Sequence, residues 1–194
     1  MIPRLVVASK NPDKIVEIEE VLAGSGLAGE IVRGLEWPDI EETGETLEEN
    51  ALLKARAVMG AVGLPAVADD TGLEVAALDG APGVRTARFA GPSASYADNV
   101  SHLLRELEGV DDRRARFRTA VALVMPDGEE LVVDGFLDGV IAREPRGTGG
   151  FGYDPIFEVG GRTLSEMGMG EKNTLSHRAS ALRSLARALG VGVA

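Results

Sequence analysis

The chain has 194 residues, 44% of them hydrophobic and 26% charged, which is typical of a globular protein with a buried core. It contains no cysteine, so a disulfide framework and a thiolate metal site are excluded. The formal net charge of −11 argues against nucleic acid as a partner, because duplex-binding proteins carry a basic face. No stretch approaches the roughly 18 apolar residues of a membrane span, so we expect no membrane partner and a cytoplasmic location.

The first half of the chain alternates strands and helices. Residues 4–9 predict a buried strand. Asn11 as an N-cap and Pro12 in the first turn predict a helix that the glycines at 24 and 26 end. A capping box predicts a second helix from Thr46, and residues 65–69 predict a short strand that leads into an acidic pair.

The second half predicts a third helix from Ser95, a β-hairpin and a last helix. Residues 115–125 and 130–136 read as strands joined by a Pro-Asp-Gly turn. A glycine-rich loop follows, and residues 174–189 predict the last helix. We expect one α/β domain over residues 1–194, with a central mixed β-sheet flanked by helices and a cleft at the strand ends.

The turn between the first strand and the first helix is a candidate anion site. Its residues are Ser9, Lys10, Asn11, Pro12, Asp13 and Lys14. Free backbone N–H groups and the helix dipole attract anions at such a turn, and Lys10 and Lys14 add positive charge. A plain helix cap with two solvated lysines is the alternative.

Carboxylates at two places predict a magnesium site. Asp69 and Asp70 follow the apolar strand, where alternation of side chains directs one of them more toward the cleft. Two adjacent carboxylates repel each other unless a cation or a proton lies between them, so we favour metal binding over an acidic turn. One of the paired glutamates Glu41 and Glu42 is a further candidate ligand, although such pairs are usually solvated.

The glycine-rich loop at residues 147–152 formally matches G-x-G-x-x-G. A dinucleotide-binding turn must open a helix, and Pro155 directs the preceding residue away from helix, so we reject that interpretation. The loop could instead wrap a nucleotide, with Phe151 stacking on the base. The alternative is a tight loop with a core aromatic residue.

Three potential donors lie near the start of the predicted last helix. Lys172, His177 and Arg178 oppose the helix dipole there, which indicates an anionic or acceptor-rich ligand. A structural role for His177 is the alternative.

Seven segments carry a family resemblance. They are Ser9-Lys10-Asn11-x-x-Lys14, Glu41-Glu42-Thr43-Gly44, Glu49-Asn50-Ala51-x-x-Lys54-Ala55, Ala68-Asp69-Asp70-Thr71-Gly72-Leu73, Gly80-Ala81-Pro82-Gly83, the run from Gly147 to Pro155, and Ser176-His177-Arg178. In this order they resemble the inosine/xanthosine triphosphate pyrophosphatase family over nearly the whole chain. The chain differs from the family pattern at Lys10, where a glycine is usual, and at Thr71, where a serine is usual.

This resemblance implies a homodimer of elongated, two-lobed subunits with a deep cleft. It implies Mg²⁺-dependent hydrolysis of ITP, dITP and XTP to the monophosphate and pyrophosphate. By position, residues 9–14 and Lys54 would hold the phosphates, and Glu42 and Asp70 the metal, with Asp70 as proton acceptor. The remaining implied residues are Asp69 and Glu49 in support, Thr71 at the substrate, and Phe151, Gly152, Tyr153, Asp154, Lys172, His177 and Arg178 at the base.

Three hypotheses therefore compete. The first is the pyrophosphatase, in which Asp70 orients the attacking water rather than fully deprotonating it, because its pKa suits a general base poorly. The second is a Maf-type pyrophosphatase with another base preference, which Phe151 and residues 176–178 argue against. The third is a nucleotide-binding module without catalysis, which the acidic pair beside the anion turn argues against.

Overall fold

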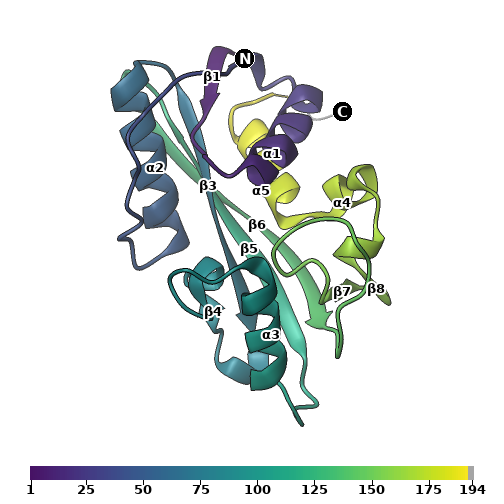
Figure 1. The fold of residues 1–194 in the computed structure, drawn as a ribbon. Coiled ribbons are helices and arrows are strands. Elements are labelled where there is room, and N and C mark those ends of the chain that lie inside the picture. The colour runs from purple at the N-terminus through teal and green to yellow at the C-terminus, as the bar shows by residue number, and fades with distance from the viewer. Residues whose placement is uncertain (192–194) are drawn as a thin grey trace. The chain divides into compact units, whose positions relative to one another are not determined.

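The computed structural model describes residues 1–191, which form two compact units (Figure 1). Unit 1 combines Met1–Asp70, Thr119–Gly135 and His177–Ala194, and unit 2 combines Thr71–Arg118 and Phe136–Ser176. The described residues contain five α-helices and eight β-strands, which confirms the predicted mixed α/β fold. None of the helices in this part of the chain is long and apolar enough to cross a membrane.

The strand order of the sheet in unit 1 indicates where a ligand could bind. Its strands are β1 (Ile2–Val7), β2 (Ala28–Val32) and the parts of β3 (Ala66–Val75), β5 (Arg114–Val124) and β6 (Glu130–Ile141) that fall in this unit, in the order β2-β1-β3-β5-β6. β1 pairs in parallel with both β2 and β3. The strand order therefore reverses at β1, and the carboxyl end of β1, where Val7 pairs with Val67 of β3, marks the switch point where α/β sheets bind ligands.

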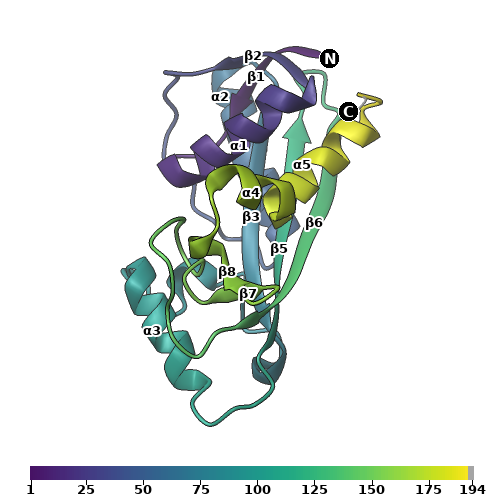
Figure 2. The same cartoon turned by 90° about the vertical axis from the view of Figure 1, so that its right-hand side faces the viewer.

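Helices cover both faces of this sheet. α1 (Pro12–Ser25) and α5 (His177–Ala188) pack together on one face, and α2 (Leu47–Val62) lies on the other (Figures 1 and 2). Leu5 and Val67 belong to the apolar cluster that includes α1 and α5. The alternate strand residues are also buried and therefore face α2, so both faces of β1 and β3 are inside the unit.

Unit 2 is built around the remaining parts of β3, β5 and β6. It adds β4 (Pro82–Gly83), α3 (Tyr96–Glu106), β7 (Phe157–Val159), β8 (Arg162–Thr163) and α4 (Met169–Leu175). Its strand order is β3-β5-β6-β7-β8, with β4 antiparallel to β3. Its core includes the rings of Phe117 and Phe157, whose centroids lie 4.5 Å apart.

The predicted starts of the first three helices are confirmed. Asn11 caps α1, and its side-chain oxygen accepts hydrogen bonds from the backbone N–H groups of Asp13 and Lys14 at 3.0 and 3.4 Å. Thr46 and Ser95 form complete capping boxes on α2 and α3. The end of α1 differs slightly from the prediction, because Gly26 in the left-handed conformation ends the helix and Gly24 lies inside it.

Two strands are longer than predicted. β3 does not end at the acidic pair but continues to Val75, with Leu73 and Val75 fully buried. The acidic pair resembles a strand end in sequence, yet both carboxylates are buried against cationic partners inside the strand. β6 likewise continues past residue 136 to Ile141, where it pairs with β7.

The prediction of a single last helix over residues 174–189 is wrong, because the structure has two helices in this region. α4 ends at Leu175, and Ser176 adopts an extended conformation with φ −61° and ψ 147° before α5 begins at His177. Serine is a favoured residue at helix N-termini, so the break is compatible with its local chemistry. As a result Lys172 belongs to unit 2, whereas His177 and Arg178 belong to unit 1.

Gly135 in β6 is required by the close approach of α5. A Cβ at this position would lie 2.1 Å from the backbone oxygen of His177 and 2.2 Å from the backbone nitrogen of Ala181. We expect Gly135→Ala to lower the free energy of unfolding by about 1–3 kcal/mol or more, because backbone atoms must shift. Urea denaturation measures the loss.

Gly60→Ala is the matched control for that variant. Gly60 lies in α2, and a Cβ there would meet nothing within 4 Å. Alanine is favoured over glycine inside helices by about 0.5–1 kcal/mol, so this variant should be neutral or stabilised. Equal stability of the two variants would contradict the assigned role of Gly135.

Candidate active site

The turn that joins β1 to α1 directs its two lysines to different partners. The ammonium group of Lys14 lies 3.2 Å from a carboxylate oxygen of Asp69. Lys10 instead forms an exposed ion pair with Asp39 at 2.5 Å. Lys10 lies outside the left-handed region of backbone conformation, so a lysine fits this position where the family often has glycine.

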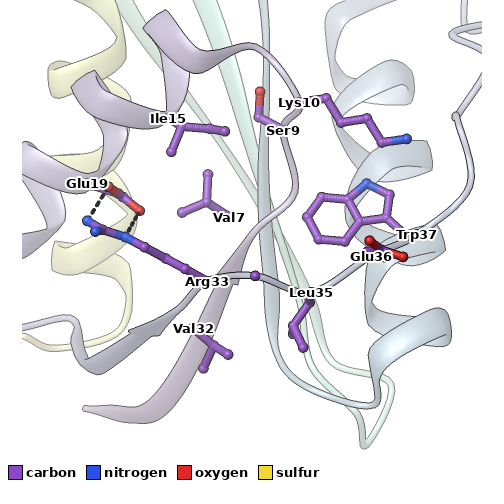
Figure 3. A pocket seen from close by; sticks show the side chains of 11 residues that line it. Val7, Ser9, Lys10, Ile15, Glu19, Val32, Arg33, Leu35, Glu36 and Trp37 are labelled. Carbon is purple, nitrogen blue, oxygen red and sulfur yellow. Dashed lines mark hydrogen bonds and ion pairs between the residues drawn. The ribbon is translucent and has the colours of Figure 1, made fainter.

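A cavity of about 680 Å³ in unit 1 lies beside the same turn. Figure 3 shows Ser9, Lys10 and Trp37 on one side of it, and the ion pair of Arg33 with Glu19 on the other. Ser9 and Lys10 of the turn therefore line this cavity, whereas Lys14 contacts the carboxylate of Asp69.

Asp69 and Asp70 are both buried, with exposed fractions of 2% and 6%, and they point to opposite faces of β3. Asp69 contacts Lys14 of α1, and Asp70 contacts Lys54 of α2. The two side chains therefore alternate between the faces of the strand, as predicted. Each carboxylate pairs with its own lysine, and the two do not share one cation.

Asp69 is the centre of a buried charge cluster that also contains Glu17. Arg178 donates to Asp69 from Nε at 3.0 Å and forms an ion pair with Glu17. Burial alone raises the pKa of Asp69, but Lys14, Arg178 and Lys54 hold that pKa far below its usual range. Asp69 is therefore ionised at neutral pH, and its carboxylate holds Lys14 and Arg178 in place.

Glu17 was not identified from the sequence. It is only 4% exposed and lies next to Ile18, on the helix face that the apolar spacing assigns to the core. An acidic residue on a buried helix face needs a cationic partner. A glutamate among the apolar positions of this helix could therefore have been recognised in the sequence as a candidate for a buried ion pair. The partner, Arg178, is 161 residues away and could not be chosen from the sequence.

Asp70 lies in a second cluster on the α2 face. The ammonium of Lys54 is 3.1 Å from Asp70 and 2.9 Å from Glu42. Burial, with smaller contributions from Glu42 and Asp69, raises the pKa of Asp70 against the opposing effect of Lys54 and Lys14. Although burial lowers the pKa of Lys54, the carboxylates of Asp70, Asp69 and Glu42 raise it above its ordinary value, so Lys54 is charged.

Asn50 supports this cluster, a role that the sequence motif containing it did not predict. Its amide nitrogen donates to Asp70 at 3.3 Å, and its amide oxygen accepts from the backbone N–H of Gly44 at 2.8 Å. A Cβ at Gly44 would lie 2.7 Å from that oxygen, which explains the glycine. Glu49 accepts from the backbone N–H groups of Glu45 and Thr46 and so holds the same loop.

The donor set at Glu42 and Asp70 fits a magnesium ion. An oxygen of each carboxylate lies within 3.1 Å of the same place, which the Lys54 ammonium occupies. In residues 1–191 no group of three or more His, Cys, Asp or Glu side chains could hold a metal. Mg²⁺ commonly uses one or two carboxylates and takes its other ligands from water and substrate phosphates, so two carboxylates are sufficient.

Unit 2 holds the predicted base-binding residues of the glycine-rich loop. Asp154 accepts from the backbone N–H of Phe151 at 2.8 Å and from Lys172 at 2.7 Å. The Lys172 ammonium also lies 4.7 Å from the centre of the Phe151 ring, a cation–π arrangement. These contacts join the loop and α4 into one connected group.

The other predicted substrate residues of unit 2 have separate positions. Gly152 has a positive φ of 62°, and the hydroxyl of Tyr153 donates to the backbone oxygen of Thr86 at 3.0 Å. Thr71 is half-buried in β3.

The three donors near the predicted last helix have separate partners. His177 is 5% exposed, and its Nδ1 lies 2.5 Å from the hydroxyl oxygen of Thr119. Arg178 contacts Asp69 and Glu17, and Lys172 contacts Asp154 in the other unit. The predicted location at the start of the last helix is confirmed for His177 and Arg178, which begin α5, and is wrong for Lys172, which lies in α4. Contact of the three side chains with a nucleotide base stays a prediction.

Comparisons with known proteins identify the family. The model of the Ham1 family matches residues 5–188. A dITP/XTP pyrophosphatase of Streptomyces coelicolor is 48% identical over 94% of both chains, and that of Symbiobacterium thermophilum is 50% identical over 96% of this chain and 93% of its own. A HAM1 protein structure from Coxiella burnetii matches with a TM-score of 0.84 and 43% identity, covering 98% of this chain and all of that one.

The structure defines an α/β protein with two buried carboxylate–lysine clusters beside a parallel part of its sheet. The chain belongs to the Ham1 family. This result confirms the resemblance identified from the seven sequence segments and decides against the Maf-type hypothesis.

Proposed function

We propose that this protein hydrolyses ITP, dITP and XTP to the nucleoside monophosphate and pyrophosphate, and so removes non-standard purine nucleotides. The observation that carries the proposal is the convergence of Glu42, Lys54 and Asp70, with Asp70 just beyond Val67, where the pairing of β3 with β1 ends. The names of the relatives, dITP/XTP pyrophosphatase, support the same substrates.

Cleavage between the α- and β-phosphates requires charge neutralisation and an oriented water more than covalent help from the protein. In this proposal Lys14 and Lys54 neutralise phosphate oxygens, and residues 9–13 contribute the helix N-terminus and Lys10. Glu42 and Asp70 would hold Mg²⁺, which supplies further charge neutralisation at the phosphates when it is bound.

Asp70 is proposed to orient the attacking water and to accept its proton. Burial raises the pKa of Asp70 toward the range in which a carboxylate is a useful base. Asn50 and Lys54 hold its two oxygens in place, so the carboxylate is pre-positioned. Asp69, on the other face of the strand, would act on Lys14 rather than on the water.

Base recognition is proposed for the loop and α4 of unit 2. Phe151 offers a ring for stacking, and Lys172 offers an ammonium that can donate to a C6 keto oxygen. Adenine presents an amino group at that position, which would leave the donor unpaired. His177 and Arg178 stay candidates for further contacts, although their partners in unit 1 give them a structural role as well.

The test is a pyrophosphate-release assay with ITP, dITP, XTP, GTP and ATP, each with and without Mg²⁺. Released pyrophosphate is detected as phosphate after addition of inorganic pyrophosphatase, and the assay without that enzyme is the control. We expect kcat/KM for ITP, dITP and XTP to exceed that for ATP by about 10²-fold or more, and to require Mg²⁺. Tight binding of Mg²⁺-ITP without turnover would instead support a binding module.

The homodimer and the cytoplasmic location are proposed with this function. The homodimer rests on the family resemblance, and the cytoplasmic location rests on the sequence, in which no apolar stretch approaches the length of a membrane span. Sedimentation of the purified protein tests the dimer.

A further inference from the structure

The position between Glu42 and Asp70 is occupied by a cation that belongs to the chain. The Lys54 ammonium lies 2.9 Å from the Glu42 carboxylate and 3.1 Å from that of Asp70. Lys54 and Asp70 are buried, with exposed fractions of 9% and 6%. The ammonium therefore neutralises the same two carboxylates that would bind a metal ion.

A metal ion and this ammonium cannot share the position. Mg²⁺ binds carboxylate oxygens at about 2.0–2.1 Å, which is well inside the distances that the ammonium keeps from them. Two cations so close together also repel each other strongly in a poorly solvated site. Entry of the metal therefore requires that Lys54 leave its present place.

The surrounding contacts indicate which parts can move. Asp70 lies in the middle of β3 and is held by Asn50. Glu42 lies on a segment without helix or strand, and its side chain is 37% exposed. Lys54 has a flexible four-carbon stem, so its ammonium can swing from the carboxylates to nearby phosphate oxygens.

We propose that Lys54 is a placeholder cation, which keeps the metal affinity of the nucleotide-free protein low and gives up its position when substrate phosphates offer it another partner. Metal and nucleotide would then bind with positive coupling, because each favours the same displaced state of Lys54. The inference rests on the proposed function for the identity of the phosphate ligand, but its first part concerns the metal alone.

The test measures binding of Mn²⁺ to the protein without nucleotide, from the loss of the free-ion electron paramagnetic resonance signal. We expect Lys54→Met to bind Mn²⁺ at least about tenfold more tightly than the wild type, since the competing charge is removed. Arg56→Met is the matched control, because it removes the same charge from the same helix, α2, at an exposed side chain that pairs with Glu130 instead. Its affinity should stay within about twofold of the wild type.

An unchanged Mn²⁺ affinity in Lys54→Met would overturn the proposal, and so would an equal gain in Arg56→Met, which would indicate a general charge effect. Lys54→Gln is the second variant, because its amide can still donate to Asp70 if the methionine variant fails to fold. If both variants are unfolded without metal, the proposal requires Mn²⁺ to restore their circular dichroism, and failure to do so counts against it.

The outcome is separable from that of the proposed function. If the wild type hydrolyses dITP but Lys54→Met gains no metal affinity, the placeholder is wrong and the function stands. If the wild type hydrolyses none of the five nucleotides but Lys54→Met gains affinity, the function is wrong and the exclusion of metal by Lys54 stands.

Discussion

Asp70→Asn is expected to lower kcat/KM for dITP by about 10²–10⁴-fold, the range that a general base commonly contributes. The amide cannot accept the proton of the attacking water and is a poor ligand for Mg²⁺. The pyrophosphate-release assay at saturating Mg²⁺ measures the loss. Asp111→Asn, the same change at an exposed carboxylate in unit 2, should retain the wild-type rate.

The Asp70→Asn variant should nevertheless fold. Burial raises the pKa of Asp70 in the folded protein, so its ionisation opposes folding: this cost begins as the pH rises above the ordinary value of 3.8 and is complete above the raised pKa. Asparagine removes this cost, keeps the shape, and leaves Lys54 paired with Glu42. We therefore expect an unchanged or higher free energy of unfolding at pH 7 in urea. Full activity in this variant, or its failure to fold, would contradict the assigned role.

Asp69→Asn should have the opposite phenotype, a loss of about 3–5 kcal/mol in the free energy of unfolding at pH 7. The substitution leaves the guanidinium of Arg178, which is 2% exposed, without one of its two carboxylates. It also removes the partner of Lys14. Urea denaturation followed by circular dichroism measures this loss.

The penalty should shrink at low pH. The pKa of Asp69 in the folded protein lies far below the ordinary value of 3.8, so its contribution is complete above that value and is lost as the pH falls toward the folded pKa. In this window the unfolded chain binds more protons, and one such group changes the unfolding free energy by up to about 1.4 kcal/mol per pH unit. The gap between wild type and Asp69→Asn should therefore narrow from pH 5 to pH 3.

Asp112→Asn is the control for this pH dependence. Asp112 is exposed, and hydrogen bonds from Arg114 lower its pKa to about 2. Exposed pairs contribute little because solvent screens them, so this variant should follow the wild type at every pH. A gap for Asp69→Asn that stays constant with pH would show that lost packing, rather than lost charge, explains its instability.

Local features of the sequence were sufficient for the helix starts and the hairpin. Asn11, Thr46 and Ser95 cap their helices through hydrogen bonds within three residues, so the information lies in a short window. The turn after Met125 closes through the bond from Gly128 to Met125 for the same reason. The resemblance to known pyrophosphatases then selected the candidate site residues by position.

The length of β3 and the break at Ser176 were not predictable in this way. A buried acidic pair inside a strand is stable only because cations from α1, α2 and α5 surround it. Seen alone, the same two residues are typical of a strand end. Ser176 likewise interrupts a sequence of good helix spacing without a glycine or proline to mark the place.

The sequence by itself determined the α/β class, the caps and the family, because these depend on periodicity, short-range hydrogen bonds and the order of motifs. Only the tertiary structure decided that Asp69 pairs with Arg178, 109 residues away, and that Asp70 and Glu42 share Lys54. The physical reason is that buried charges require partners at about 3 Å, and chain folding alone decides which distant residues come that close.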